Sequence, residues 1–282
     1  MSYKKLPVTS GGGSTVVEES PSNYILFDDY HQDEYQTGVD SKVLKEGSSS
    51  FAFAERKSAD FNLSMSLNTN GYRSLSVTST GDYFKCGISG NPLNVALTPV
   101  VFNEAFYPSG RTKSTVKYTF KQKVFIPVID DKVSYFCGLM ACDEVGQVAD
   151  IDKFVMDFCY GLQVGGPSTG SPNDTKSYFR KLINGTESFT ELFNNSLPGG
   201  NFVELKIVMY FTSLGPPSPP GSFGYSLEFY LDDTLIDEST GEGISLSVTS
   251  PICLGYSIVG NDSIDDTKAI SIDYDYLKRE EV

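Results

Sequence analysis

The sequence has no tryptophan and a single histidine, His31, among its 282 residues. Histidine is the side chain whose ordinary pKa lies closest to neutral pH, so its scarcity disfavours acid–base catalysis. His31 itself stands in a polar segment, where a solvated surface position is expected. The serine elbow of the hydrolases and the glycine-rich phosphate loops are missing as well. The sequence therefore predicts no catalytic constellation and no enzyme.

Positive charge is also scarce, because 22 Lys and Arg residues stand against 36 Asp and Glu, a net charge of −14. Such a chain repels the phosphate backbone of nucleic acids, so DNA and RNA are not expected partners. No apolar run is long enough to span a membrane. Lys4 and Lys5 are not followed by the apolar stretch of a signal peptide. We expect a protein that is made in the cytoplasm without a signal peptide and is not inserted into a membrane.

Cysteines are few, and their spacing shows no Cys-x-x-Cys pair. They stand at Cys86, Cys137, Cys142, Cys159 and Cys253. Most have apolar or aromatic neighbours, which predicts buried free thiols in a reducing environment. Zinc would need a tighter group of ligands, so a zinc site is not predicted.

What the chain does contain is period-two alternation, clearest in its last eighty residues. Residues 202–211, 225–231 and 269–276 each place apolar side chains on one face and polar side chains on the other. In the last segment Ile270, Ile272, Tyr274 and Tyr276 are expected to point inward. Segment 154–162 has apolar residues on both faces, which predicts a central strand. This pattern is typical of antiparallel strands over a core.

Turn signals separate the expected strands. Asn70-Gly71 and Asn184-Gly185 predict tight hairpins, and Asp232-Asp233 predicts another turn. Segment 188–191 has the spacing of a helix capping box, which predicts one short helical turn. The proline- and glycine-rich segments 165–172 and 214–221 are expected to be loops.

The run 230–236, with its Asp232-Asp233 turn, and the terminal run 270–276 together resemble the end of concanavalin A-like lectin and laminin-G-type domains. The resemblance implies an all-β fold, an antiparallel jelly-roll β-sandwich over residues 24–282. Lectins, glycanases and viral surface proteins use this fold.

Residues 1–23 differ from the rest, because a Gly/Ser link at 10–15 lies between a short basic start and an acidic, proline-containing end. This composition predicts an extended N-terminal arm that docks on a partner. The side chains expected to make the docking contacts are Lys4, Lys5, Leu6, Val8, Val16 and Val17.

Ligand sites are predicted at two places. A carbohydrate would be met by exposed aromatic rings, with Tyr83, Tyr107 and Tyr178 as the candidates. Calcium, the one metal for which a site is predicted, would be held by loop oxygens of Asp262, Asp265 and Asp266. No other cofactor is expected.

The signal-less acidic sandwich with its Gly/Ser arm resembles, in the style of its sequence, the structural proteins of tailed-bacteriophage virions. This resemblance implies a non-enzymatic virion surface protein, either a capsid decoration or cement protein or a fibre or adhesin subunit. Capsid or tail proteins are its expected partners, and host surface glycan is its candidate ligand. Closed symmetry, with a trimer as the first expectation, would suit a projecting module. Two alternatives stay open: a glycan-active enzyme of the same fold, and an oligomeric scaffold without a ligand.

Overall fold

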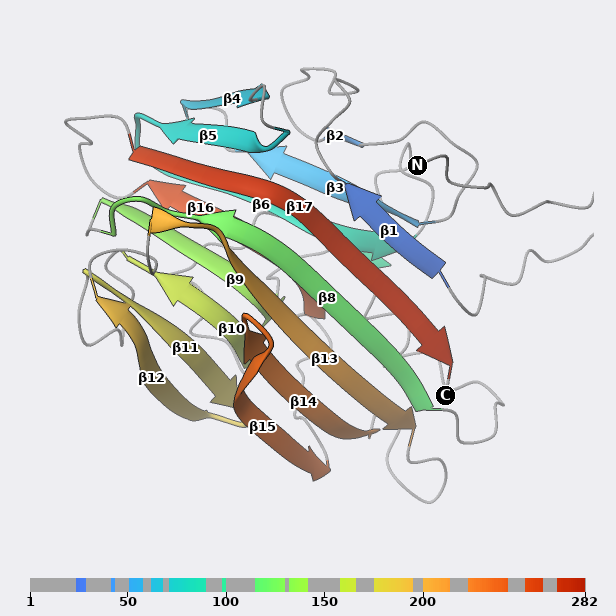
Figure 1. Cartoon of the computed structure of the whole chain (residues 1–282). Coiled ribbons are helices and arrows are strands. Elements are labelled where there is room, and N and C mark those ends of the chain that lie inside the picture. The colour runs from blue at the N-terminus through green and yellow to red at the C-terminus, as the bar shows by residue number, and fades with distance from the viewer. Residues whose placement is uncertain are drawn as a thin grey trace, which may run out of the picture.

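The computed structural model describes residues 24–28, 42–43, 51–57, 62–67, 71–89, 98–99, 115–129, 132–141, 158–165, 175–194, 200–213, 223–242, 252–260 and 268–281. These residues form two antiparallel sheets that lie face to face as layers (Figure 1). The predicted docking arm, Tyr107, and the aspartates proposed as calcium ligands lie outside the described residues. No helix in the described part of the chain is long and apolar enough to cross a membrane.

The first sheet has eight strands within the described residues. In spatial order seven of them are β15 (Thr234–Glu242), β14 (Phe223–Leu231), β13 (Val203–Ser213), β8 (Thr115–Phe125), β17 (Lys268–Glu281), β5 (Arg73–Val77) and β4 (Leu63–Leu67). The eighth, β1 (Tyr24–Asp28), pairs with the second half of β17, beyond the stretch that β5 occupies.

The second sheet has nine strands within the described residues. In spatial order eight of them are β12 (Thr186–Asn194), β11 (Lys176–Ile183), β10 (Phe158–Val164), β9 (Val133–Ala141), β16 (Ile252–Gly260), β6 (Gly81–Ser89), β3 (Phe51–Lys57) and β2 (Lys42–Val43). The ninth, β7 (Thr98–Pro99), pairs with the end of β6.

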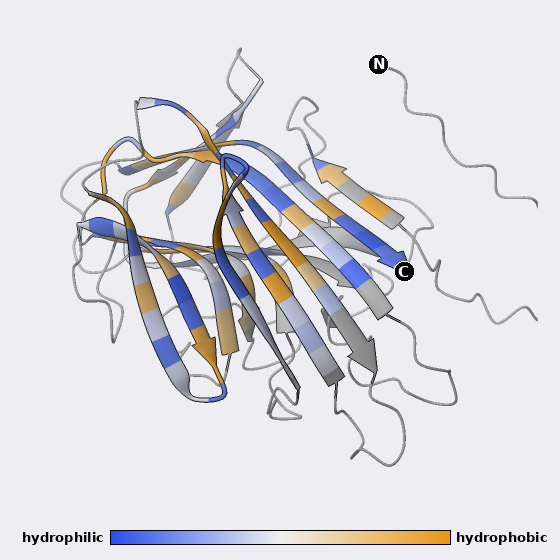
Figure 2. Cartoon of the chain, turned by 60° about the horizontal axis from the view of Figure 1, so that its bottom comes forward, coloured by the Kyte–Doolittle hydropathy of each residue, from blue (hydrophilic) through white to orange (hydrophobic). Residues whose placement is uncertain are grey.

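The alternation in β13 shows why these segments become strands. Val203, Leu205 and Ile207 are buried, whereas Glu204 and Lys206 between them are partly exposed. A period of two puts one set of side chains on the inner face and the other on the outer face. Figure 2 shows the same alternating bands along the neighbouring strands. The predicted antiparallel strands over a core are confirmed.

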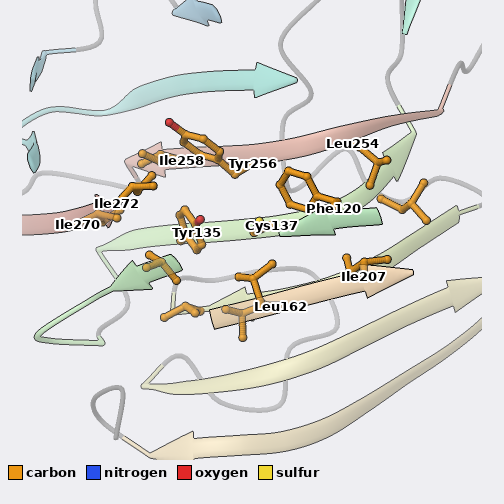
Figure 3. Packing of buried hydrophobic residues seen from close by; sticks show 14 of the residues in the cluster. Phe120, Tyr135, Cys137, Leu162, Ile207, Leu254, Tyr256, Ile258, Ile270 and Ile272 are labelled. Atoms are coloured by element: carbon orange, nitrogen blue, oxygen red, sulfur yellow. The ribbon is translucent and has the colours of Figure 1, made fainter. Parts of the chain in front are cut away.

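The core fills the space between the sheets (Figure 3). Phe120 of β8 and Ile207 of β13 project from the eight-stranded sheet toward Cys137 of β9 and Leu162 of β10. The central strand predicted over residues 154–162 is confirmed for Phe158–Leu162, because these residues belong to β10, which β9 and β11 flank and whose residues are all buried. Residues 154–157 lie outside the described residues. Cys137 and Cys159 are buried free thiols, as predicted.

The hairpin predictions at Asn184-Gly185 and Asp232-Asp233 hold, but the helical turn does not, and Asn70 of the Asn70-Gly71 turn lies outside the described residues. Asn184-Gly185 joins β11 to β12, and Asp232-Asp233 joins β14 to β15, with positive φ at each of these residues. Positive φ at both central positions is the geometry of the tight turns that match the twist of the flanking strands. Residues 188–191, predicted to form a helical turn, lie inside β12. Their pairing with β11 outweighs the local capping preference.

The inward face of β17 differs from the prediction. The pairing of β17 with β8 shifts between Ile272 and Tyr274, which leaves Asp273 as an extra residue. Such a β-bulge puts two consecutive side chains out of step with the period of two. Ile270 and Ile272 are buried as expected, whereas Tyr274 and Tyr276 are partly exposed and Asp275 is buried. The prediction that Tyr274 and Tyr276 point inward is therefore wrong.

The reversed phase brings Asp275 into the core, where it meets Lys85 of β6. Lys85 Nζ lies 2.6 Å from Asp275 Oδ2 and 3.0 Å from Asp28 Oδ2 of β1. Gln122 donates its Nε2 to Asp275 Oδ1 at 2.8 Å and accepts a hydrogen bond from the hydroxyl of Tyr135. Lys85 and Asp275 are each only 1% exposed. A buried charge is tolerated when it is paired and hydrogen-bonded in this way.

A second polar link joins the sheets at their other end. The hydroxyl of Tyr160 in β10 donates to Asp237 Oδ2 of β15 at 3.1 Å, and Lys181 Nζ of β11 lies 2.8 Å from Asp237 Oδ1. Burial, with the nearby carboxylate of Asp237, raises the pKa of Tyr160 far above its usual value, so the phenol stays a donor. The sheet order and strand registers confirm the predicted all-β fold, an antiparallel jelly-roll β-sandwich.

Candidate functional site

The outward side of the eight-stranded sheet, here called the open face, carries aromatic rings among charged side chains. Its rings include those of Phe27 of β1, Tyr210 of β13, Tyr230 of β14, and Tyr274 and Tyr276 of β17. All are at least partly exposed, and Phe27 is 38% exposed. Ile25, one pleat away on β1, is 57% exposed. Rings of this size are usually buried, so their gathering on one face marks it as a candidate binding surface.

Strand register places several of these side chains in one row across the sheet. Tyr230 lies opposite Lys206, Lys206 opposite Lys121, Lys121 opposite Tyr276, and Tyr276 opposite Phe27. Neighbouring strands are about 4.8 Å apart, so the row is roughly 19 Å long from its first strand to its last. Phe27 also packs 5.9 Å from Tyr274 and 6.4 Å from Tyr276, measured between ring centroids. The row is therefore a strip with aromatic ends and a cationic centre.

Beside this row, Glu204 is held by two donors. Lys121 Nζ lies 2.8 Å from Glu204 Oε1, and the hydroxyl of Tyr274 donates to Glu204 Oε2. Partial burial alone would raise the pKa of Glu204, but these two hydrogen bonds and the Lys121 charge outweigh it and lower the pKa. Burial and the bond to Glu204 in turn raise the pKa of Tyr274. The carboxylate and the phenol thus keep fixed roles as acceptor and donor.

Tyr230 anchors the other end of the row. Its hydroxyl donates to Glu228 Oε2 at 2.7 Å, and this hydrogen bond is the main cause that raises the pKa of Tyr230 to about 12. Lys206 Nζ lies 4.0 Å from the centre of the Tyr230 ring and 3.4 Å from Asp233 Oδ1. The ammonium group over the ring is a cation–π contact.

The chemistry of the open face suits recognition of a hydroxyl-rich ring. An exposed phenol offers an apolar face for the C–H side of a sugar and a polar tip for its hydroxyls. The ammonium and carboxylate groups are already oriented by one another on a rigid sheet, so binding would cost little ordering of side chains.

Sequence reasoning chose other tyrosines as the carbohydrate platform. Tyr83 is 1% exposed and lies in the core, where its ring centroid is 5.8 Å from that of Tyr256. Tyr178 is 3% exposed and lies on the outward side of the nine-stranded sheet, opposite Gln163. The prediction that Tyr83 and Tyr178 form an exposed platform is wrong, because the type of residue does not reveal how far its strand face is covered.

The rings that the prediction missed carried a signal in the sequence. Tyr210 and Tyr230 stand at the polar positions of clean alternations, in phase with Lys206 and Glu228. An aromatic residue in the polar phase of a strand is expected on the outer face. For Tyr274 and Tyr276 no such signal exists, because Asp and Tyr alternate there and either phase can be read as inward.

The outward side of the nine-stranded sheet is covered instead of open. Phe136, Met140 and Gln163 are fully buried there, although their side chains point away from the core between the sheets. Arg180 binds Glu187 with two nitrogens, at 2.9 Å from Nε and 2.8 Å from Nη2, and donates Nη1 to Gln163 Oε1 at 3.0 Å. This face is held by its own contacts.

Within the described residues, no group of three or more His, Cys, Asp or Glu side chains is arranged to hold a metal ion. The calcium prediction at Asp262, Asp265 and Asp266 concerns residues outside that part of the chain and stays a prediction.

No protein-family model matches the chain, and no curated protein matches its sequence. Among solved structures, the chain is similar to peanut lectin with a nine-residue peptide, at 11% identity and a TM-score of 0.42 over 92% of this chain and 98% of the lectin. It is similar to the carbohydrate-binding module CBM66 from Bacillus subtilis, at 13% identity and a TM-score of 0.30 over 80% and 92% of the two chains.

The binding domain of botulinum neurotoxin serotype C1 is also similar, at 11% identity and a TM-score of 0.39 over 82% of this chain and 45% of the other. The chain thus spans less than half of the neurotoxin binding domains that it matches. At these identities the likeness concerns the fold alone, and the sandwich assignment rests on the sheet order and strand registers given above.

Proposed function

We propose that this protein is a non-enzymatic glycan-binding protein whose open face holds the sugar chain. The observation that carries the proposal is the row from Tyr230 to Phe27, in which partly exposed rings flank hydrogen-bonded charged groups on a rigid sheet. A sugar chain laid across the strands would meet rings at both ends of this row and polar groups between them. A row of roughly 19 Å, four strand spacings, would accommodate several sugar units.

Binding to a panel of polysaccharides, measured by affinity electrophoresis, tests this proposal. Tyr276→Ala and Tyr230→Ala should each weaken retention about three- to tenfold, since an aromatic contact contributes roughly 0.5–1.5 kcal/mol. Phe189→Ala is the matched control, because it removes a half-buried ring from the nine-stranded sheet. Equal retention of the wild type and both tyrosine variants on every glycan would exclude the open face as the site.

The setting that we propose for this binding protein is the surface of a bacteriophage virion, where residues 1–23 would dock on capsid or tail proteins and the sandwich would project. The composition of the 1–23 segment supports this proposal. Quantitative mass spectrometry of purified particles would measure the copy number of the chain. A number near that of the major coat protein would indicate decoration, a small multiple of the tail symmetry would indicate a fibre, and absence would refute the virion role.

Deletion of residues 1–23 tests the docking arm separately. The first described strand of the sandwich is β1, so we expect the shortened protein to keep its melting temperature while it loses attachment to particles. The homo-oligomer, with a trimer as the first expectation, can be measured on the same samples by light scattering. A large fall in melting temperature would show that the segment stabilises the fold, contrary to a docking role.

An enzyme acting on glycans is the second candidate, and one observation favours it. Glu228 of β14 and Glu238 of β15 lie directly opposite one another on the open face. Opposite residues have Cβ atoms roughly 4.5–5.5 Å apart, and retaining glycosidases place two carboxyl groups about 5–5.5 Å apart. Release of reducing ends from β-glucan, lost in Glu228→Gln and Glu238→Gln, would establish the enzyme. Retention of the same glycan without any release supports the binding protein.

A further inference from the structure

We propose that the centre of the open face is a subsite for an anionic group, so that the preferred ligand is an acidic polysaccharide carrying a sugar carboxylate. This inference rests on the proposed glycan-binding function and adds the chemical class of the glycan. The inference rests on a group of four lysines, here called the basic centre: Lys117 and Lys121 of β8, Lys206 of β13 and Lys278 of β17.

Two lysines of the basic centre face each other across neighbouring strands. Lys206 and Lys121 are direct partners in the β13–β8 register, and both side chains are partly exposed, at 22% and 31%. Like charges directly opposite one another destabilise a sheet. In a chain of net charge −14, acidic residues are plentiful, so packing alone gives no reason for a lysine in both places. An anion between the two ammonium groups would remove the repulsion.

The other lysines surround the same spot. Thr119 stands two residues from both Lys117 and Lys121 on β8, and residues two apart in a strand share a face. Across the sheet, Thr119 lies opposite Lys278 on one side and Val208 on the other. The Thr119–Val208 pair is therefore a floor of short, uncharged side chains, with lysine residues on three sides and Glu228 opposite Val208 on the fourth.

The carboxylates that balance these lysines lie at the edges of this floor. Glu204 and Asp233 neutralise Lys121 and Lys206 from the side away from Thr119, at 2.8 Å and 3.4 Å. Glu280 serves two lysines at once, 2.6 Å from Lys278 and 4.0 Å from Lys117. The floor itself holds no carboxylate, so a carboxylate of a ligand can approach the basic centre from solvent.

The aromatic rings lie where they would hold the sugar of such a ligand beside the basic centre. Tyr276 lies opposite Lys121, and Tyr210 lies opposite Lys117 with its ring 5.6 Å from that ammonium group. A sugar ring resting on either phenol would bring a carboxylate substituent to the edge of the Thr119–Val208 floor. Charge complementarity at the centre and stacking at the sides thus describe one ligand, a chain of sugars that carry carboxylates.

Affinity electrophoresis in gels that contain one polymer at a time tests the subsite. The polymers are polygalacturonate, its methyl-esterified neutral form, dextran sulfate and dextran. Wild-type protein should be retained most by polygalacturonate, and retention should weaken as salt is added. The double variant Lys121→Gln/Lys206→Gln should lose about tenfold in affinity for polygalacturonate and change little on the methyl ester. Similar retention by dextran sulfate, lost in the same variant, would support the anion subsite and extend it to sulfate esters.

The control variant Lys132→Gln/Lys268→Gln changes the net charge equally and should bind like the wild type. Lys268 lies opposite the buried Val77, in the core-facing phase of β17, and Lys132 directly precedes β9 of the other sheet. Equal polygalacturonate affinity of both double variants and the wild type would overturn the subsite. If Tyr276→Ala still weakened binding in that case, the glycan-binding proposal would survive without its anionic specificity. Absence of retention on all polymers would refute the proposed function itself.

Discussion

At the scale of single residues, the ion pair of Lys85 and Asp275 is almost completely buried. Both side chains have left water, and such a desolvated pair is tolerated only if each charge keeps its partner. Asp275 also accepts from Gln122, so the pair belongs to a network that spans both sheets. Asp28 adds β1 to the same network, which ties the first described strand to the core.

Removal of one charge from this pair should destabilise the protein strongly. Asp275→Asn keeps the shape of the side chain but removes the nearer of the two carboxylates that bind Lys85, and it should lower the free energy of unfolding by about 3–5 kcal/mol. The double variant Lys85→Met/Asp275→Leu removes both charges and should cost clearly less than the single change. Urea denaturation measures both values. A single variant as stable as the wild type would show that the pair is not coupled in the folded protein.

Glu204 should make stability depend on pH on the acid side. Its pKa is lowered in the folded protein, so its contribution is fully present above the ordinary carboxyl pKa and is lost as pH falls through the folded value. Glu204→Gln should therefore cost stability at pH 7, and this cost should shrink toward pH 3. Tyr274→Phe, which removes one of the two donors, should reduce the same pH dependence. A cost that stays constant between the two pH values would contradict the assignment.

At the scale of elements, the bulge in β17 decides which side chains form the open face. Asp273 is the extra residue. Its neighbours Ile272 and Tyr274 pair with Val124 and Lys123, two consecutive residues of β8, as they would in a regular strand without Asp273. The bulge therefore needs no change elsewhere in the sheet. It also leaves Asp273 on the outside, 2.8 Å from Lys123.

Deletion of Asp273 should accordingly be tolerated, because β17 would become regular with Asp275 still inward and Tyr276 still outward. Deletion of Ser271 should not be tolerated, since it would turn Ile270 from the core to solvent. Thermal unfolding followed by circular dichroism compares the two. Loss of the folded state in the Asp273 variant would show that the bulge itself is required.

The contact between β9 and β10 depends on Gly138 and Gly161, which lie opposite one another. A Cβ placed on Gly161 would lie 2.2 Å from the carbonyl oxygen of Cys137, whereas a Cβ on Gly185 would meet nothing within 4 Å. Gly161→Ala should therefore abolish folding or cost more than about 3 kcal/mol. Gly185→Ala, strained only by its positive φ, should cost about 1–2 kcal/mol. Equal costs in chemical denaturation would mean that the strands separate easily at this point.

The elements also show what the sequence could and could not reveal. In β13 and β14 every second residue is apolar, so strand, inner face and hairpin turn were all predictable. In β17 the run Asp273-Tyr274-Asp275-Tyr276 alternates equally well in either phase, and only pairing with β8 decides between them. The same ambiguity concealed the outward position of Tyr274 and Tyr276. Tyr83 and Tyr178 were misplaced because their burial depends on distant segments, not on their neighbours in sequence.

At the scale of the whole molecule, polar links and an apolar core hold the sheets together. Lys85 and Asp275 connect β6 to β17, while Asp237 connects β15 to both β10 and β11. Since these links lie at separate places in the sandwich, the sheets are fixed in register as well as in distance. That rigidity is what keeps the row on the open face in a single arrangement.

The net charge of −14 should make the stability of the whole molecule rise with moderate salt. Surface ion pairs such as Lys123–Asp273 contribute about 0–1 kcal/mol each and are weakened by salt, whereas the repulsion summed over all the excess carboxylates is screened at the same time. The buried Lys85–Asp275 pair is screened least. The melting temperature should therefore increase between about 10 mM and 150 mM NaCl, where the Debye length falls from roughly 30 Å to 8 Å.

The double variant Lys121→Gln/Lys206→Gln separates the stabilisation by local ion pairs from the repulsion among all the excess carboxylates. It loses two positive charges and two surface ion pairs. If long-range repulsion dominates, this variant should gain more in melting temperature from the added salt than the wild type does. Sodium chloride is the right salt for the comparison, since sulfate also strengthens apolar burial. A melting temperature that falls with salt in both proteins would mean that the local ion pairs of the open face outweigh the global charge.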